Sequence, residues 1–121
     1  MSVVVALREE LAAATRRLLA AVATLSEGDV AAPSRLPGWT RGHVLSHVAR
    51  NADSLHNLLT WARTGVRTPQ YGSDEERDTG IEAGAGRPLA EHLTDLEMSA
   101  ARLAAAADAM PAQAWSARVV G

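Results

Sequence analysis

The 121-residue chain lacks cysteine, lysine and phenylalanine, and it has one isoleucine and one tyrosine. Without cysteine there can be no disulfide, no cysteine-ligated metal and no cysteine nucleophile. Aromatic residues make up 3% of the chain, whereas 25 residues are alanine and 14 are leucine. Because alanine and leucine favour helices and strands favour aromatic and β-branched residues, composition argues against an all-β fold and predicts an all-α one.

Charge and hydropathy exclude two classes of partner. The net charge is −2, so there is no excess of basic residues for binding nucleic acid. No apolar run approaches the roughly 18 residues of a membrane span, and the start MSVVVALREE is a poor signal peptide. We therefore expect a cytoplasmic protein with no membrane partner. Much alanine and arginine with no lysine indicates GC-rich coding, as in actinobacteria.

Apolar residues recur at spacings of three and four over three segments. This spacing predicts long helices over 2–26, 40–64 and 88–110, each with one apolar stripe. The length fits a single domain over 1–121, and three such helices favour an antiparallel bundle. The stripes consist of Leu7, Leu11, Ala14, Leu18, Val22 and Leu25; of Val44, Val48, Ala52, Leu55, Leu59 and Ala62; and of Leu89, Leu93, Leu96, Ala100, Leu103, Ala107 and Met110.

Residues that cap or break helices mark the connections. Residues 27–29 (Glu-Gly-Asp) end the first helix, and a proline-containing loop over 30–38 follows. Thr40 is a good N-cap for the second helix, and Gly65 suits its C-terminal end. The glycine-rich segment 65–87 is irregular, but Ser73 starts a capping-box pattern that predicts a short helix over 74–83.

His47 is the histidine best placed for a site inside the bundle. A helical-wheel projection puts His47 and Asn51 beside the apolar stripe of 40–64, His43 nearer solvent and His56 on the other margin. For a single inward histidine, the more common explanation is a half-buried side chain satisfied by a neighbour, and spacing fixes no second metal ligand. His92 falls at the core margin of the third long helix.

Two residues of the irregular segment are further candidates for ligand binding. Arg77 is either a surface arginine or an anchor for a carboxylate substrate, because guanidinium pairs with carboxylate through two hydrogen bonds. Tyr71 lies in the same segment. Trp39, directly before the second helix, is predicted to pack at the end of the bundle.

The segment LPGWTRGHVLSHVARNADSLHNLLTWARTG, residues 36–65, resembles the mycothiol-dependent maleylpyruvate isomerase family of DinB-like metalloproteins. The likeness continues through 68–88 and the third long helix to about residue 115. Its most specific element runs from Trp39 to the histidine eight residues later. In the DinB-like superfamily that histidine binds the metal, so the resemblance assigns this role to His47 and not to His43.

The resemblance implies an enzyme that isomerises maleylpyruvate from cis to trans inside a DinB-like four-helix bundle. It implies one divalent metal, typically zinc, and mycothiol as the thiol cofactor. A thiolate adds to the activated double bond, the resulting single bond rotates, and the thiolate leaves. The small-molecule partners are thus a carboxylate substrate and a low-molecular-weight thiol; Asn51, Arg77 and Tyr71 are candidates for binding one of them.

The family's other metal ligands, a Glu and a His four residues apart on a fourth helix, have no counterpart here. No Glu of 1–121 lies four residues before a His. The fourth helix is therefore missing, and three functions stay open: the N-terminal part of the isomerase, a thiol S-transferase of the same superfamily, or a non-catalytic helical module. Three apolar stripes without a fourth helix also predict a homodimer or a partner chain across the groove they leave open.

Overall fold

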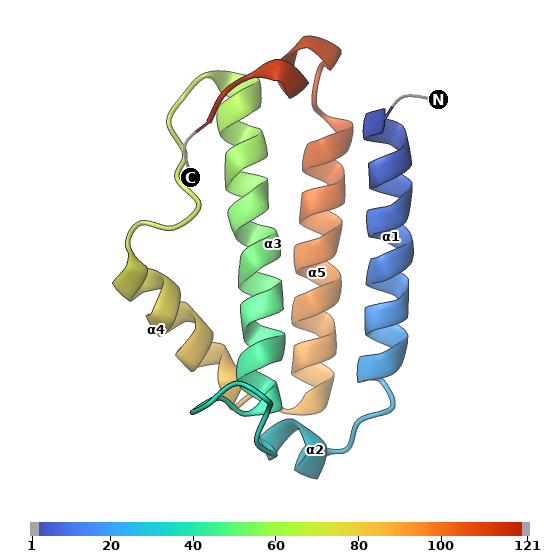
Figure 1. The fold of residues 1–121 in the computed structure, drawn as a ribbon, viewed down its shortest axis with the longest axis vertical. Helices are drawn as coiled ribbons and strands as arrows, with labels where there is room; N and C mark the ends of the chain where they lie inside the picture. Colours follow the sequence, from blue (N-terminus) through green and yellow to red (C-terminus); the bar gives the residue numbers. More distant parts are fainter. Residues whose placement is uncertain (1–2, 120–121) are drawn as a thin grey trace.

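The computed structural model describes residues 3–119, and no strand occurs among them. Three long helices stand side by side, and shorter helices connect them (Figure 1). The predicted all-α architecture is confirmed. The helices are α1 (Val3–Val22), α2 (Glu27–Ala31), α3 (Arg41–Thr64), α4 (Asp74–Ala85) and α5 (Leu89–Asp108), followed by the 3-10 helix η1 (Ala112–Ser116).

Most helix ends follow the local signals of the sequence. Thr40 caps α3 by accepting a hydrogen bond from the His43 amide, and Gly65 ends α3 with a φ of 74°. Ser73 caps α4 by accepting from the Glu76 amide. The predicted helix over 74–83 is therefore correct and runs two residues further, to Ala85. The predicted start at residue 2 lies outside the described residues.

The connection after α1 differs from the prediction. The first helix ends at Val22 rather than at residue 26, and residues 27–31 form the short helix α2 instead of a terminating turn. Ser26 and Asp29 form a reciprocal capping box, which starts this helix. The Glu27 carboxylate accepts a hydrogen bond from the Leu89 amide at 2.9 Å, which ties α2 to the first residue of α5.

The long helices are not all antiparallel. Arg50 of α3 pairs with Asp95 of α5 at 2.5 Å, and Asp53, one turn later, pairs with Arg102 at 2.9 Å. Residue numbers rise together in both pairs, so α3 and α5 run in the same direction (Figure 1). The predicted antiparallel bundle is wrong here, because α4 carries the chain back along α3 before α5 begins. Of the three long helices, α1 runs in the direction opposite to α3 and α5.

The core lies mainly between α3 and α5, and α1 contributes to it near its C-terminal end. Its central cluster consists of Val22, Leu45, Ala49 and Leu96. Leu7 and Leu11 of the predicted α1 stripe are 60% and 48% exposed. On α3, the buried positions include Leu45 and Ala49 instead of the predicted stripe, because α4 and α5 cover two sides of this helix.

Candidate functional site

His47 lies on α3, two turns after the helix begins. Its ring packs at a tilt of 48° against the Trp39 indole, with 5.6 Å between ring centroids. Its Nδ1 atom is buried and has no hydrogen-bond partner within residues 3–119. Because a buried nitrogen without a partner is costly, this position calls for an explanation, and a bound ligand would supply one.

The surroundings of His47 favour the neutral imidazole. Partial burial lowers its pKa, and the positive charge of Arg77 on α4 lowers it further. A neutral imidazole has a lone pair available for a metal ion or a proton. The ring is therefore in the protonation state that a metal ligand or a general base needs at neutral pH.

His43 is placed differently from the prediction. It is not a solvent-facing residue, because its side chain is only 13% exposed. Its ring stacks on Trp39 with 6.1 Å between centroids, Nδ1 lies 3.1 Å from the Thr40 amide, and Nε2 lies 3.0 Å from both Glu82 carboxylate oxygens. Both ring nitrogens of His43 are thus used to cap α3 and to fasten α4 to it.

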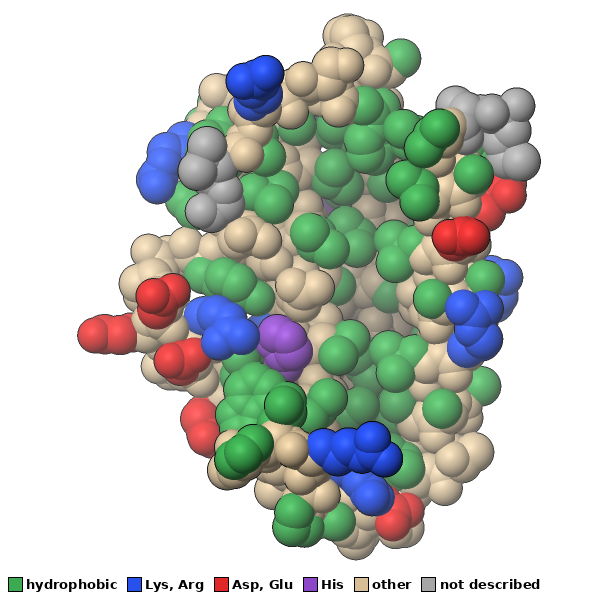
Figure 2. All heavy atoms as spheres, viewed as in Figure 1, with side chains coloured by type: hydrophobic (Ala, Val, Ile, Leu, Met, Phe, Trp, Pro, Cys, Tyr) green, Lys and Arg blue, Asp and Glu red, His purple; other side chains and the backbone are tan. Residues whose placement is uncertain are grey.

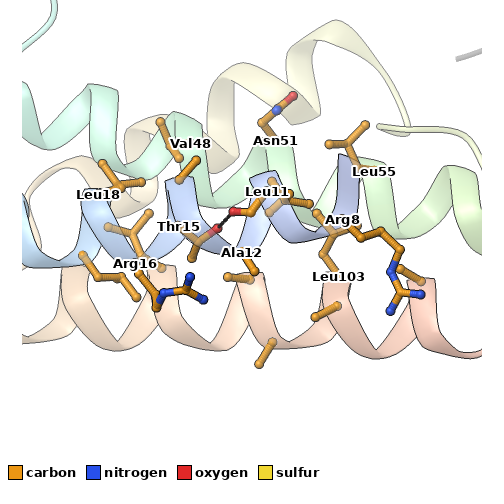
Figure 3. A pocket seen from close by; sticks show the side chains of 18 of the residues that line it. Arg8, Leu11, Ala12, Thr15, Arg16, Leu18, Val48, Asn51, Leu55 and Leu103 are labelled. Atoms are coloured by element: carbon orange, nitrogen blue, oxygen red, sulfur yellow. Dashed lines mark hydrogen bonds between the residues drawn. The ribbon is translucent and has the colours of Figure 1, made fainter. Parts of the chain in front are cut away.

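The other predicted site residues are distributed around His47 without forming one cluster. Arg77 is half-buried on α4 and bonds Asp78 at 3.0 Å, which leaves further guanidinium donors for a ligand. Tyr71 is half-buried in the segment before α4. Asn51 is exposed, and its side chain lines the opening between α1 and α3 (Figure 3). No hydrogen bond joins His47 to Asn51 among the described residues.

A complete metal centre is not formed by residues 3–119. No group of three or more His, Asp or Glu side chains within them could hold a metal ion. His47 can supply one donor, whereas a zinc site normally has three or four protein ligands. His92, predicted at the core margin, is fully buried on α5.

An apolar groove of about 780 Å³ lies between α1, α3 and α5, beside this site. Hydrophobic side chains run down the middle of that face of the molecule, with a histidine and an arginine at one side (Figure 2). The groove residues named here are Leu11, Leu18, Val48, Asn51, Leu55 and Leu103. It lies where the apolar stripes of the three long helices predict a groove.

Known proteins resemble this chain in both sequence and fold. Residues 11–121 match the family model of the mycothiol maleylpyruvate isomerase N-terminal domain. The chain belongs to this family. A crystal structure titled mycothiol-dependent maleylpyruvate isomerase is 36% identical with a TM-score of 0.87, and it covers 93% of this chain. A histidine-to-alanine mutant of that isomerase matches at 35% identity and a TM-score of 0.86. No curated protein sequence matches.

This member of the mycothiol maleylpyruvate isomerase family spans 48% of the length of either isomerase structure. None of the helices within residues 3–119 is long and apolar enough to cross a membrane.

Two features near His47 were missed by helical periodicity. Trp39 packs against both histidine rings, and Glu82 is the partner of His43. The tryptophan eight residues before His47 was the available signal for the first, whereas Glu82 depends on how α4 packs.

Proposed function

We propose that this chain is the His47-bearing N-terminal part of a cis–trans isomerase that acts on maleylpyruvate with mycothiol. The observation that carries the proposal is the unpartnered Nδ1 of His47 beside Trp39, in a chain 36% identical to such an isomerase over 93% of its length. The neutral ring that burial and Arg77 favour supports the role of metal ligand.

The reaction needs a nucleophile that adds and leaves again. A thiolate bonds to one carbon of the activated double bond, and the electron pair moves toward the adjacent carbonyl. The carbon–carbon bond is then single and rotates; loss of the thiolate restores the double bond in the trans form. No atom is gained or lost. Arg77 is proposed to hold a substrate carboxylate through its free donors, and Tyr71 and Asn51 are proposed to contact substrate or thiol.

Zinc, the cofactor that the family resemblance implies, fits this chain only in part. His47 is one suitable donor, and the remaining donors would have to come from outside residues 3–119. We therefore assign no metal-dependent step to the chain by itself, and we expect it to bind zinc weakly.

The incomplete donor set and the open groove support a second candidate function. The chain would then be a non-catalytic helical module that holds a partner chain along α1, α3 and α5. The two candidate functions can be told apart by product formation. Only the isomerase proposal predicts that product forms and that its formation depends on His47.

A zinc titration monitored by isothermal titration calorimetry tests whether His47 is a metal ligand. We expect weak binding by the unmodified chain, loss of the binding heat in His47→Ala, and retention in His56→Ala, the matched control on the same helix. Stoichiometric zinc that survives dialysis would contradict the expected weak binding. Equal heats in both variants would remove His47 as a ligand.

The isomerase proposal is tested by following fumarylpyruvate formation from maleylpyruvate with mycothiol and added zinc. We expect His47→Ala to lower the rate above the thiol background by about 10–100-fold, a usual cost of disturbing a metal site. His56→Ala should retain the rate. A rate above background that His47→Ala leaves unchanged would contradict the proposed role of His47.

A further inference from the structure

Trp39 is in contact with two histidine rings at the start of α3. The His43 imidazole stacks on the indole at an interplanar angle of 13°, with 6.1 Å between ring centroids. The His47 ring, one helical turn further along α3, packs on the same indole at 48° and 5.6 Å. Any movement of the indole therefore changes the space in which the His47 ring can turn.

The backbone of Trp39 is held by the loop before α3. Its carbonyl oxygen accepts hydrogen bonds from the Ser34 amide at 2.9 Å and the Ser34 hydroxyl at 2.8 Å, and its amide donates to the Leu36 carbonyl at 3.1 Å. Gly38, directly before it, has a φ of 79°, a conformation that favours glycine. These contacts fix the Cα of Trp39 but not the rotation of its side chain. The orientation of the indole therefore depends on what it packs against.

His43 presents a fixed surface to the indole, because both of its ring nitrogens are hydrogen-bonded. Nδ1 accepts from the Thr40 amide at 3.1 Å, so the neutral ring carries its proton on Nε2. Nε2 lies 3.0 Å from each carboxylate oxygen of Glu82 and donates to them. The last turns of α4 lie beside the first turns of α3, which brings Glu82 to this ring (Figure 1). Hydrogen bonds at both nitrogens hold the plane of the His43 ring against Trp39.

His47 lacks the hydrogen bond that usually orients a histidine ligand. A histidine that binds a metal normally donates its other ring N–H to a carboxylate or a carbonyl. The buried Nδ1 of His47 has no such partner within residues 3–119. The orientation of its ring therefore depends on packing, and the Trp39 indole is the aromatic surface against it.

We propose that His43 and Glu82 are positioning residues for His47 and that they act through Trp39. Glu82 fixes the His43 ring, the His43 ring holds the indole, and the indole sets the orientation of the His47 imidazole. This inference rests on the metal-ligand role proposed above for His47. It gives the carboxylate–histidine pair on neighbouring helices the orienting task that a hydrogen bond to the ligand itself usually has.

A purely structural role for His43 predicts a different pattern of mutational effects. As the third residue of α3, His43 completes the capping box that Thr40 begins. Glutamine at this position also completes a capping box, so His43→Gln keeps the cap and removes the flat ring. His43→Phe does the opposite, because it keeps an aromatic ring against Trp39 and removes both hydrogen bonds. The two variants therefore separate the cap from the ring.

Proton NMR of the metal-free chain measures the contact between the His47 ring and Trp39, because an indole shifts the signals of protons near its face. We expect His43→Gln to move the His47 ring signals toward those of a histidine without an aromatic neighbour. Glu82→Leu should act in the same direction. Glu82→Gln, whose amide oxygen still accepts from Nε2 of His43, should restore most of the unmodified pattern. His56→Gln, the control on the same helix, should leave the His47 signals unchanged.

Two results of the NMR experiment would overturn the proposal. One is unchanged His47 signals in both His43→Gln and Glu82→Leu. The other is a larger disturbance in His43→Phe than in His43→Gln, because the cap rather than the ring would then be what matters. If circular dichroism shows that His43→Phe is unfolded, the Gln and Leu variants decide the question by themselves.

Zinc calorimetry separates this proposal from the ligand role of His47. We expect His43→Gln to weaken zinc binding by about 10–100-fold, the usual cost of losing a residue that orients a ligand. If His47→Ala abolishes the binding heat and His43→Gln leaves it unchanged, His47 is a ligand but His43 does not position it, and this proposal is wrong. If neither variant changes the heat, the ligand role itself fails, whereas the NMR signals still decide whether His43 and Glu82 hold the His47 ring.

Discussion

His92 shows how one buried histidine couples stability to pH. Its side chain is fully buried, and its ring lies against the Ala85 backbone. Arg87, Asp95 and Glu27 are the charged groups around it. Burial lowers its pKa below the ordinary 6.5, and the charge of Arg87 acts in the same direction. The folded protein therefore favours the neutral ring.

We predict that the free energy of unfolding falls as the pH is lowered from 7 to about 5. Below the ordinary pKa, the unfolded chain binds a proton that the folded chain resists, so acid favours unfolding. His47, whose pKa is also lowered, adds to the effect. Urea unfolding at several pH values measures it. His92→Gln should flatten the pH dependence more than His56→Gln; equal slopes would assign the effect elsewhere.

Asp95 of α5 joins its helix to α3 and to the connection between α4 and α5. Its carboxylate pairs with Arg50 at 2.5 Å and with Arg87 at 2.7 Å, and its side chain is only 12% exposed. We predict that Asp95→Asn lowers the free energy of unfolding by about 1.5–3 kcal/mol, the usual range for hydrogen bonds to a charged group. Asp78→Asn removes an exposed pair with Arg77 and should change little. Similar small losses in urea unfolding would refute the role of Asp95.

Among the helices, α3 and α4 pack unusually closely because glycines lie where they meet. A Cβ on Gly42 would clash with the Ala85 carbonyl oxygen, and one on Gly84 would meet the Ser46 hydroxyl. A Cβ on Gly80 of α4 would meet only the Arg50 side chain at 3.6 Å. These contacts set the position of α4, and with it Arg77 beside His47.

We therefore predict opposite effects of the same substitution at two helical glycines. Gly42→Ala should destabilise the fold although alanine favours helices, since a backbone carbonyl cannot move aside cheaply. Gly80→Ala should stabilise it by about 0.5–1 kcal/mol through helix propensity. Thermal unfolding of both variants is sufficient; stabilisation by Gly42→Ala would show that α4 does not pack as closely as described.

Local signals in the sequence located the longer helices and α4, but they missed α2 and did not reveal how the helices are arranged. Thr40, Gly65 and Ser73 act within one turn of chain, so capping rules located those helix ends. The parallel course of α3 and α5 depends on how α4 packs through Gly42 and Gly84, which no periodicity reveals. Periodicity favoured His47 because this residue lies beside an apolar stripe. It missed the contacts of Trp39 and Glu82 with the histidine rings, because periodicity does not reveal such contacts.

Across the whole molecule, stability is distributed unevenly among the long helices. Both α3 and α5 bury five residues, whereas α1 buries Val22 alone, near its end. The ion pairs of Asp95 and Asp53 connect α3 to α5, while α1 is joined to α5 through the exposed pair of Arg8 and Asp108. Helices with few buried contacts open at lower free energy than the global unfolding.

We predict that amide hydrogens of α1 exchange faster than those of α3 and α5 in the dilute chain. The difference should be largest toward the start of α1, because Leu7 and Leu11 are exposed there. Hydrogen exchange measured by mass spectrometry on peptides from α1, α3 and α5 measures this difference. Equal protection of all three helices at low concentration would mean that α1 is held as firmly as the α3–α5 pair, which its single buried side chain does not explain.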